Sequence, residues 1–76
     1  MTIVAIAGAT GDLGGRIAAA LRAGGAEVRA LVRQESDSQA LTQLREQGCE
    51  VVLVDLGDAA TLREALRGAD VVISAL

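Results

Sequence analysis

The sequence has no lysine, histidine, proline or aromatic residue, and each absence excludes a kind of function. Without an imidazole, phenol or amine side chain, acid–base chemistry would fall to carboxylates or a thiol, and no catalytic residue can be assigned within these 76 residues. Without aromatic rings, stacking on nucleic-acid bases is excluded. The net charge of −3, with no basic run, also argues against a nucleic-acid partner.

The sequence also has a single cysteine and no long apolar run. Cys49 is the one cysteine, which excludes an intrachain disulfide and a cysteine zinc cluster within these residues. Its place at the start of an apolar run predicts a small, buried packing residue. No stretch approaches the ~20 apolar residues of a membrane span, and residues 1–8 do not resemble a signal peptide. We therefore expect no membrane partner, no metal site and a cytoplasmic location.

Apolar residues make up 51% of the chain, which is typical of a packed domain rather than a disordered segment. They gather in four β-rich runs, each nearly continuous rather than alternating, as in parallel strands that are buried on both faces. The four predicted strands are residues 2–7, 27–32, 50–55 and 70–76.

Each gap between these strands carries a helical pattern with its own start and stop signals. The first helix is predicted over residues 11–23, with Gly24 as its C-terminal cap. The second is predicted to begin at Ser36, which stands at capping-box spacing from Gln39, and to end at Gly48.

The third helix is predicted to begin at Asp58 as N-cap and to end at Gly68. The order is therefore β-α-β-α-β-α-β, with short connections. Right-handed crossovers then predict an α/β fold of the Rossmann type, incomplete as a doubly wound domain, whose parallel sheet has the strand order 3-2-1-4. The side chains expected to face the sheet are Leu13, Ile17, Leu21, Leu41, Leu44, Leu62, Ala65 and Leu66.

The connection between the first strand and the first helix is rich in glycine. Residues 3–14 read IVAIAGATGDLG, with glycines at positions 8, 11 and 14. At such a turn, Gly8 allows a tight bend, Gly11 lets the backbone approach a phosphate, and Gly14 lets the helix pack closely on the sheet. The free N–H groups and the dipole of the helix N-terminus favour an anion there. The turn predicts a binding site for the pyrophosphate of a dinucleotide.

The residues between these glycines are further candidates for the same site. Thr10 either donates its hydroxyl to a phosphate oxygen or stiffens the turn. Asp12 and Leu13 begin the helix, and an acid is favoured there although its charge would repel phosphate; Asp12 is thus expected to point to solvent. Arg16 is also expected to point to solvent, the alternative being that it curls back to the phosphates.

The end of the second strand indicates which dinucleotide binds. NAD sites place an acid there, whereas NADP sites place an arginine that pairs with the 2′-phosphate. Arg33 stands at this position, and a guanidinium can hold a phosphate with two hydrogen bonds. NADP(H) is therefore favoured over NAD(H). The alternative is that Arg33 is an ordinary exposed loop residue.

Two further groups of residues follow strands at the same edge. Asp55 is predicted to accept a hydrogen bond from the adenine amino group, with the Leu56 backbone beside it; the alternative is that Asp55 caps the turn before the third helix. Ser74 and Ala75 would flank the adenosine ribose. Ser74 is not expected to be a nucleophile, because the chain has no histidine to activate it.

With these residues placed, the sequence resembles the atypical short-chain dehydrogenase/reductases, specifically the NmrA-like and isoflavone-reductase-like NAD(P)-binding proteins. The resemblance covers all 76 residues and rests on AGATGDLGGRI, VRALVR, EVVLVDLGD and LREALRGADVVISA. Gly15 departs from the basic residue that plant reductases tend to carry there. The resemblance implies that Gly8, Gly11 and Gly14 hold the pyrophosphate. It also implies that Arg33 holds the 2′-phosphate and that Asp55 and Leu56 hold the adenine.

The resemblance implies the cofactor-binding part of an NADPH-dependent reductase that transfers hydride to a small organic substrate. One alternative is a regulator that senses NADP(H) and contacts a protein partner without catalysis. Another is a stand-alone half-domain that binds a mononucleotide or nothing and oligomerises through its open edge. Because residues 70–76 would form an unpaired edge strand beside an exposed apolar patch, we expect residues 1–76 to be the N-terminal part of a longer protein. The substrate region and the family's catalytic Lys would then lie beyond residue 76.

Overall fold

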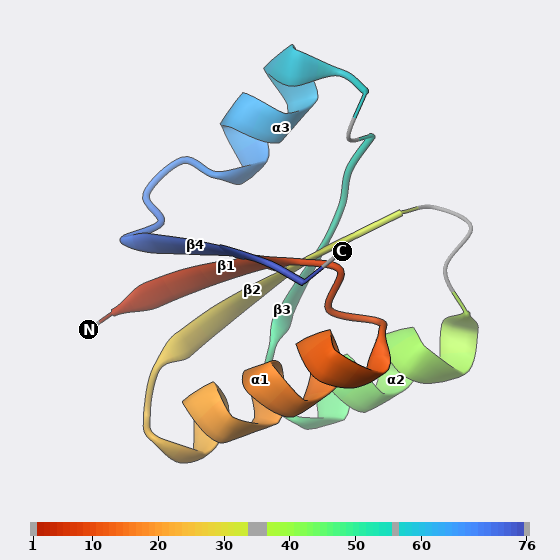
Figure 1. The fold of residues 1–76 in the computed structure, drawn as a ribbon, viewed down its shortest axis with the longest axis vertical. Coiled ribbons are helices and arrows are strands. Elements are labelled where there is room, and N and C mark those ends of the chain that lie inside the picture. The colour runs from red at the N-terminus through yellow and green to blue at the C-terminus, as the bar shows by residue number, and fades with distance from the viewer. Residues whose placement is uncertain (1, 34–36, 56, 76) are drawn as a thin grey trace.

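The structure, a computed structural model, describes residues 2–33, 37–55 and 57–75. Within them, four parallel strands form one sheet, with α1 and α2 on one face and α3 on the other (Figure 1). This is the predicted α/β architecture. The elements in chain order are β1 (Ile3–Ala7), α1 (Asp12–Ala23), β2 (Glu27–Val32), α2 (Ser38–Glu46), β3 (Glu50–Leu53), α3 (Ala59–Ala65) and β4 (Val71–Ser74).

The strands lie in the order β3-β2-β1-β4, which confirms the predicted topology. Ala7 at the end of β1 is level with Leu31 of β2 on one side and with Ser74 of β4 on the other. Leu31 is in turn level with Val52 of β3. The carboxyl ends of all four strands therefore meet at one edge of the sheet, where open α/β sheets bind their ligands.

Three strands are shorter than the sequence predicted, although their pairing continues past their ends. β1 begins at Ile3 rather than at residue 2. β3 ends at Leu53 rather than at residue 55, yet the next N–H group, of Val54, still donates to the Val32 carbonyl at 2.8 Å. Beyond β4, the Ala75 N–H donates to the Ala7 carbonyl at 2.9 Å. One further backbone hydrogen bond therefore follows each of these strands, which keeps the strand ends aligned at the edge. Leu76 lies outside the described residues.

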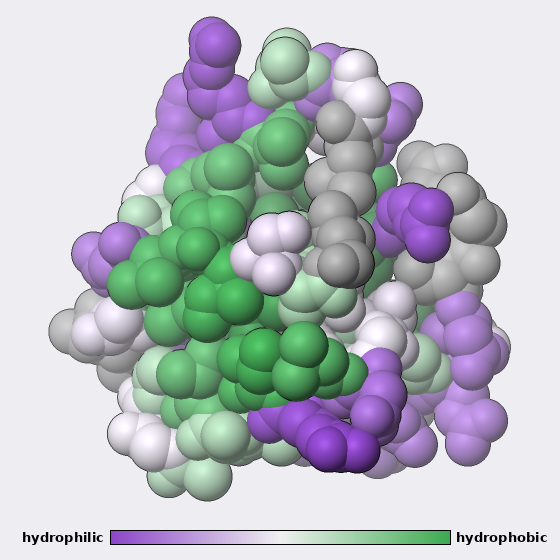
Figure 2. Space-filling view, viewed as in Figure 1, coloured by the Kyte–Doolittle hydropathy of each residue, from purple (hydrophilic) through white to green (hydrophobic). Residues whose placement is uncertain are grey.

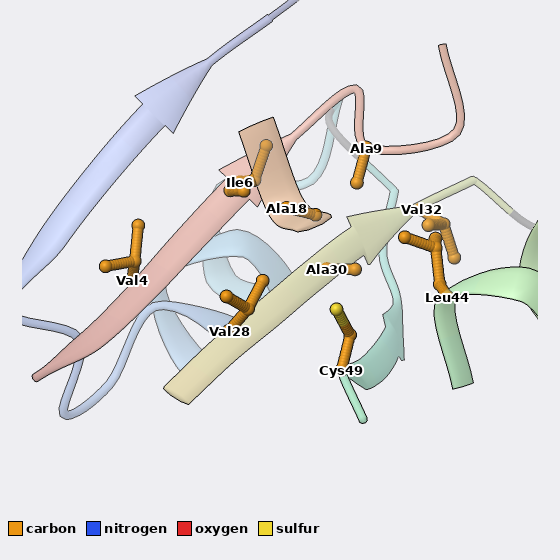
Figure 3. Close-up of a cluster of buried hydrophobic side chains, with 9 residues drawn as sticks. All are labelled: Val4, Ile6, Ala9, Ala18, Val28, Ala30, Val32, Leu44 and Cys49. Carbon is orange, nitrogen blue, oxygen red and sulfur yellow. The ribbon is translucent and has the colours of Figure 1, made fainter. Parts of the chain in front are cut away.

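The core between the sheet and the α1–α2 layer is built from small and β-branched side chains. Ala18 of α1 is fully buried, and Figure 3 shows it over the sheet between Ile6 and Ala30. Cys49 is buried in the same cluster, as predicted, and this burial raises the pKa of its thiol against the opposing effect of the Arg22 charge. The cluster consists of Val4, Ile6, Ala9, Ala18, Val28, Ala30, Val32, Leu44 and Cys49.

The other face of the sheet is covered by α3, and its core is smaller. Ala5, Leu31 and Val54 are buried there, and three α3-side residues pack against them. These three are the predicted inward-facing residues of this helix, but each is only partly buried, because one short helix cannot enclose a face of four strands. They are Leu62, Ala65 and Leu66.

Of the two predicted N-terminal caps, the one for α3 is confirmed and the one for α2 is wrong. Asp58 caps α3 as predicted, accepting hydrogen bonds from the N–H groups of Ala60 and Thr61. For α2 the predicted cap, Ser36, is wrong. The cap is Asp37, whose carboxylate accepts from the Gln39 N–H at 3.3 Å. Aspartate and serine are about equally good caps, so their order in the sequence did not decide between them; Ser36 itself lies outside the described residues.

β4 leaves one edge of the sheet open. Its Val71 and Val72 side chains are 45% and 54% exposed. In Figure 2 an apolar surface spreads over the region of β4 and the adjoining part of α1. In the described ranges, no helix is long and apolar enough to cross a membrane.

Candidate functional site

The predicted site residues that the structure describes lie along the carboxyl edge of the sheet. The turn of residues 8–11 follows β1 and leads into α1. Arg33 follows β2, Asp55 follows the end of β3, and Ser74 and Ala75 end and follow β4. Leu56 lies outside the described residues. The fold thus gathers candidates that are up to 67 residues apart in the sequence, counting from Gly8 to Ala75.

Two of the three glycines of the turn are required by the protein's own geometry. Gly8 has a φ of 83°, a left-handed conformation that other residues rarely adopt. A Cβ on Gly14 would lie 2.2 Å from the Gly8 carbonyl oxygen and 2.8 Å from the Cα of Ala9. Only a residue without a side chain lets α1 pack this closely against the turn.

Gly11 differs from its two neighbours in the motif. It is the N-cap of α1 with an extended backbone, its φ is −78°, and a Cβ there would meet its nearest neighbour at an ordinary 3.5 Å. Its N–H donates to the Gly8 carbonyl at 3.1 Å. Lacking a side-chain oxygen, Gly11 provides no side-chain cap for α1, whereas Asp37 and Asp58 cap α2 and α3. The first-turn N–H groups of α1 thus face outward at the edge where the strands end.

Asp12 and Arg16 form an ion pair on the surface of α1. The Arg16 Nη2 lies 2.8 Å from the Asp12 Oδ2, one helical turn away. Their side chains are 76% and 81% exposed, so both point to solvent as predicted. The pair itself was not predicted, although an acid and an arginine four residues apart on a helix are a sufficient signal for it.

Arg33 and Asp55 stand at adjacent places on the edge. The Val54 N–H donates to the Val32 carbonyl, so the residues that follow each are brought close along the backbone. Arg33 is exposed, and in the described part of the chain its guanidinium makes no ion pair. Its exposure suits both an anionic ligand and an ordinary loop residue.

Asp55 organises the turn that leads to α3. Its Oδ1 accepts a hydrogen bond from the Gly57 N–H at 2.9 Å, and its carbonyl accepts one from the Asp58 N–H at 3.0 Å. The structure thus contains the turn-capping hydrogen bond, which leaves lone pairs of the carboxylate for a further donor. At the neighbouring cap, hydrogen bonds from the Thr61 hydroxyl and N–H, with a lesser one from the Ala60 N–H, lower the pKa of the Asp58 carboxyl against an opposing desolvation effect.

Ser74 and Ala75 lie beside the end of β1. Ser74 pairs with Ala7, the residue before the glycine turn, and the following Ala75 N–H donates to the Ala7 carbonyl. Ser74 and Ala75 thus lie next to the glycine turn of residues 8–11.

Two hollows border the sheet. One, of about 350 Å³, runs between α1 and α2 and includes Thr10, Gly11, Asp12 and Arg16 in its walls. A larger one, of about 680 Å³, lies beside α3 and β3, on the opposite face of the sheet. The smaller hollow is the better candidate because it joins the glycine turn, while the larger one adjoins none of the predicted site residues.

The described residues at this edge include hydrogen-bond donors and a cation. They contain no cluster of three acids, cysteines or histidines that could hold a metal ion. What the edge does present is outward N–H groups at the start of α1, the Thr10 hydroxyl and the Arg33 guanidinium. Such groups can bind a phosphorylated ligand and orient it.

The chain belongs to the NmrA-like family, whose sequence profile matches residues 1–76. This confirms the resemblance that the glycine turn and the later segments indicated. Many solved structures share the fold, which agrees with the sheet order and the alternation of strands and helices described above.

Three particular proteins illustrate the similarity. Sterol demethylase protein B of Methylococcus capsulatus is 42% identical over 65 residues, which are 86% of this chain and 19% of that protein. AtPrR2, solved with NADP+ and (+)pinoresinol, is 35% identical with a TM-score of 0.90, and the match covers 99% of this chain and 26% of AtPrR2.

The third is the leucoanthocyanidin reductase of Vitis vinifera in its binary complex with NADPH, which is 25% identical with a TM-score of 0.85. The match covers 97% of this chain and 26% of the reductase. The chain thus spans between 19% and 26% of the length of these three proteins.

Proposed function

We propose that this chain binds NADP(H) along the carboxyl edge of its sheet, as the cofactor-binding part of an NADPH-dependent reductase. The observation that carries the proposal is Gly11. Positive φ accounts for Gly8 and close packing accounts for Gly14, but neither reason applies to Gly11. A phosphate lying against the Gly11 backbone supplies the missing reason. The family match supports the proposal, as do the related structures that hold NADP+ or NADPH.

Each part of the cofactor would meet a different segment of the edge. The pyrophosphate would lie on the first-turn N–H groups of α1, including those of Leu13 and Gly14, with the Thr10 hydroxyl as a further donor. Arg33 would hold the 2′-phosphate. The remaining assignments are the adenine to Asp55 and Leu56 and the adenosine ribose to Ser74 and Ala75.

Bound NADPH would supply a hydride, and the residues of this chain would bind and orient it. Because these 76 residues contain no lysine, histidine or tyrosine, a general acid of those types would come from outside them. We propose a small ring-bearing or unsaturated organic substrate, held by a region outside this chain. Oxidation of NADPH by candidate substrates of this kind tests the assignment. Tight NADPH binding without turnover would instead favour a regulator that senses NADP(H).

The sharpest test of the cofactor assignment is Arg33. In calorimetric titrations of the intact protein, Arg33→Ala should weaken NADPH binding by about 1.5–3 kcal/mol, or roughly 10- to 150-fold, because a charged hydrogen-bonded pair with the 2′-phosphate is lost. Binding of NADH, which lacks that phosphate, should change little.

Arg45→Ala provides the matched control. Arg45 is an exposed arginine in the last turn of α2, so this variant makes the same change in net charge at a different place. It should leave both affinities within about twofold, as expected for a distant, screened charge. Equal NADPH and NADH affinities in the wild type would overturn the role of Arg33, and failure to bind either dinucleotide would overturn the proposed function.

We also propose that residues 1–76 are one part of a larger NAD(P)-binding domain. The support is the open edge of β4, with Val71 and Val72 about half exposed, and the greater length of the three relatives. In such a domain a further parallel strand would pair with β4 and cover this apolar surface. A natural protein of 7.7 kDa that is a stable monomer in solution would contradict the proposal.

A further inference from the structure

Asp12 is the residue that a phosphate-binding site does not explain. It occupies the first position of α1, directly after Gly11, where the proposed pyrophosphate would approach. The helix dipole stabilises a carboxylate at this position, but the carboxylate repels the two negative charges of the pyrophosphate. Exposed charges interact over about 8–10 Å at ordinary ionic strength, so this repulsion would reach the ligand.

Arg16 faces this carboxylate from the next turn of the helix. Its Nη2 lies 2.8 Å from the Asp12 Oδ2, and both residues share the walls of the α1–α2 hollow with Thr10 and Gly11. The glycine turn itself, residues 8–11, contains no basic residue, and the next arginine along α1 is Arg22, near its far end. Arg16 is therefore the cation placed to compensate Asp12 at this end of the helix.

We propose that Arg16 is a positioning residue for the anionic cofactor: by pairing with Asp12, it holds that carboxylate and neutralises it where the pyrophosphate binds. This inference rests on the proposed function and deepens it. The pair lets α1 keep an acid at its first position, which stabilises the helix, without presenting a net negative charge to the phosphates. Arg16 acts through Asp12 and needs no contact with the cofactor.

A double-mutant cycle tests this indirect role, with NADPH and NADH titrated separately against the intact protein. Arg16→Ala should raise the Kd of both dinucleotides by about 3- to 10-fold, because the pyrophosphate common to both meets an uncompensated carboxylate. Arg16→Lys should restore binding to within about twofold, and Asp12→Asn should leave it unchanged or tighten it. In the Asp12→Asn background, Arg16→Ala should raise Kd clearly less than in the wild type, since no carboxylate remains to be held and only the screened attraction of Arg16 itself is lost.

The controls separate this role from the alternatives. Arg63→Ala, in α3 on the opposite face of the sheet, makes the same change in net charge and should leave both Kd values within about twofold. The loss caused by Arg16→Ala should also shrink as salt is raised, which a purely structural helix pair would not produce in Kd.

Three results would overturn the inference. The first is an equal loss from Arg16→Ala in the wild-type and Asp12→Asn backgrounds, because it would mean that Arg16 acts on the phosphates through its own charge and not through Asp12. The second is a loss confined to NADPH, which would place Arg16 on the 2′-phosphate, and the third is no loss at all. If the wild type bound neither dinucleotide, the proposed function and this inference would both fall, whereas binding with any of the three results overturns the inference alone.

Discussion

The two faces of the sheet are held by apolar cores of different size. The face under α1 and α2 carries nine buried residues, eight of them aliphatic and one a cysteine, in the described part of the chain (Figure 3). The face under α3 carries three, Ala5, Leu31 and Val54. The small residues Ala18 and Gly14 let α1 pack close to the first face. On the second face, α3 stands over a smaller apolar core and next to the larger hollow.

The weaker face is joined to its helix by a polar connection. Arg29, in β2, has a side chain that is 16% exposed and an Nε that lies 3.0 Å from the Glu50 carboxylate of β3. Its Nη1 donates to the carbonyl of Ala65 at 2.9 Å and to that of Arg67 at 2.7 Å, at the C-terminal end of α3. A positive charge is favoured at that end of a helix. Arginine-to-carbonyl hydrogen bonds occur on both faces, since Arg22 of α1 also donates to the Gln47 carbonyl at 3.2 Å. The faces therefore differ mainly in the size of their apolar cores, and the Arg29 hydrogen bonds reinforce the smaller one.

The largest expected difference between the faces comes from removing one apolar side chain from each. Ile6→Ala should lower the free energy of unfolding by about 2–5 kcal/mol, because Ile6 is fully buried and leaves a cavity. Leu62→Ala, under α3, should cost about half as much or less, because Leu62 is only partly buried and the site can refill with water. Urea unfolding of the intact protein measures both.

Because small domains have little stability to lose, Ile6→Ala itself is at risk of not folding. Ile6→Val, expected to cost about 0.5–1.5 kcal/mol, keeps the comparison measurable. Equal losses of unfolding free energy from matched truncations on the two faces would show that their apolar cores contribute equally to stability.

The next prediction compares two adjacent glycines on the α1 side. Gly14→Ala should destabilise the protein by about 1–3 kcal/mol or more, because its Cβ would meet backbone atoms of the turn at 2.2 and 2.8 Å. Gly15→Ala should stabilise it by up to about 1 kcal/mol, because alanine favours the helix and the nearest atom to its Cβ lies at 3.6 Å. Thermal unfolding of the two variants should shift in opposite directions. A shift in the same direction for both would show that α1 can move away from the turn.

The fold was predictable because its signals are local and agree with one another. Near-continuous apolar runs mark the strands, and Gly24, Gly48 and Gly68 mark the ends of the helices. Asp58 was identified as a cap because one acid stands directly before the helical pattern. At α2, by contrast, Ser36 and Asp37 are neighbours with nearly equal preference for the cap, and only the structure decides in favour of Asp37.

The site was predictable only in part, because the sequence indicates where a residue lies but not which groups it hydrogen-bonds. The edge on which Arg33, Asp55, Ser74 and Ala75 lie follows from strand order alone. The turn-capping role of the Asp55 carboxylate does not, because its partner, the Gly57 N–H, depends on the path of the chain after β3. Arg29 escaped prediction for a further reason. Its carbonyl partners are 36 and 38 residues away, and no local pattern announces such a contact.

The smallest of these effects tests the polar side of the comparison. Arg29→Met keeps an apolar stem against the sheet but removes the donors to the Ala65 and Arg67 carbonyls, and it should cost about 1–2 kcal/mol of unfolding free energy. Arg67→Met is the matched control, because its exposed ion pair with Glu64 should contribute less than about 0.5 kcal/mol. In hydrogen exchange, Arg29→Met should raise exchange in α3 and leave α1 protected, since the two helices lie on opposite faces with separate cores. Loss of protection in α1 as well would mean that the two faces unfold as one unit, and the difference between them would then be one of composition rather than of stability.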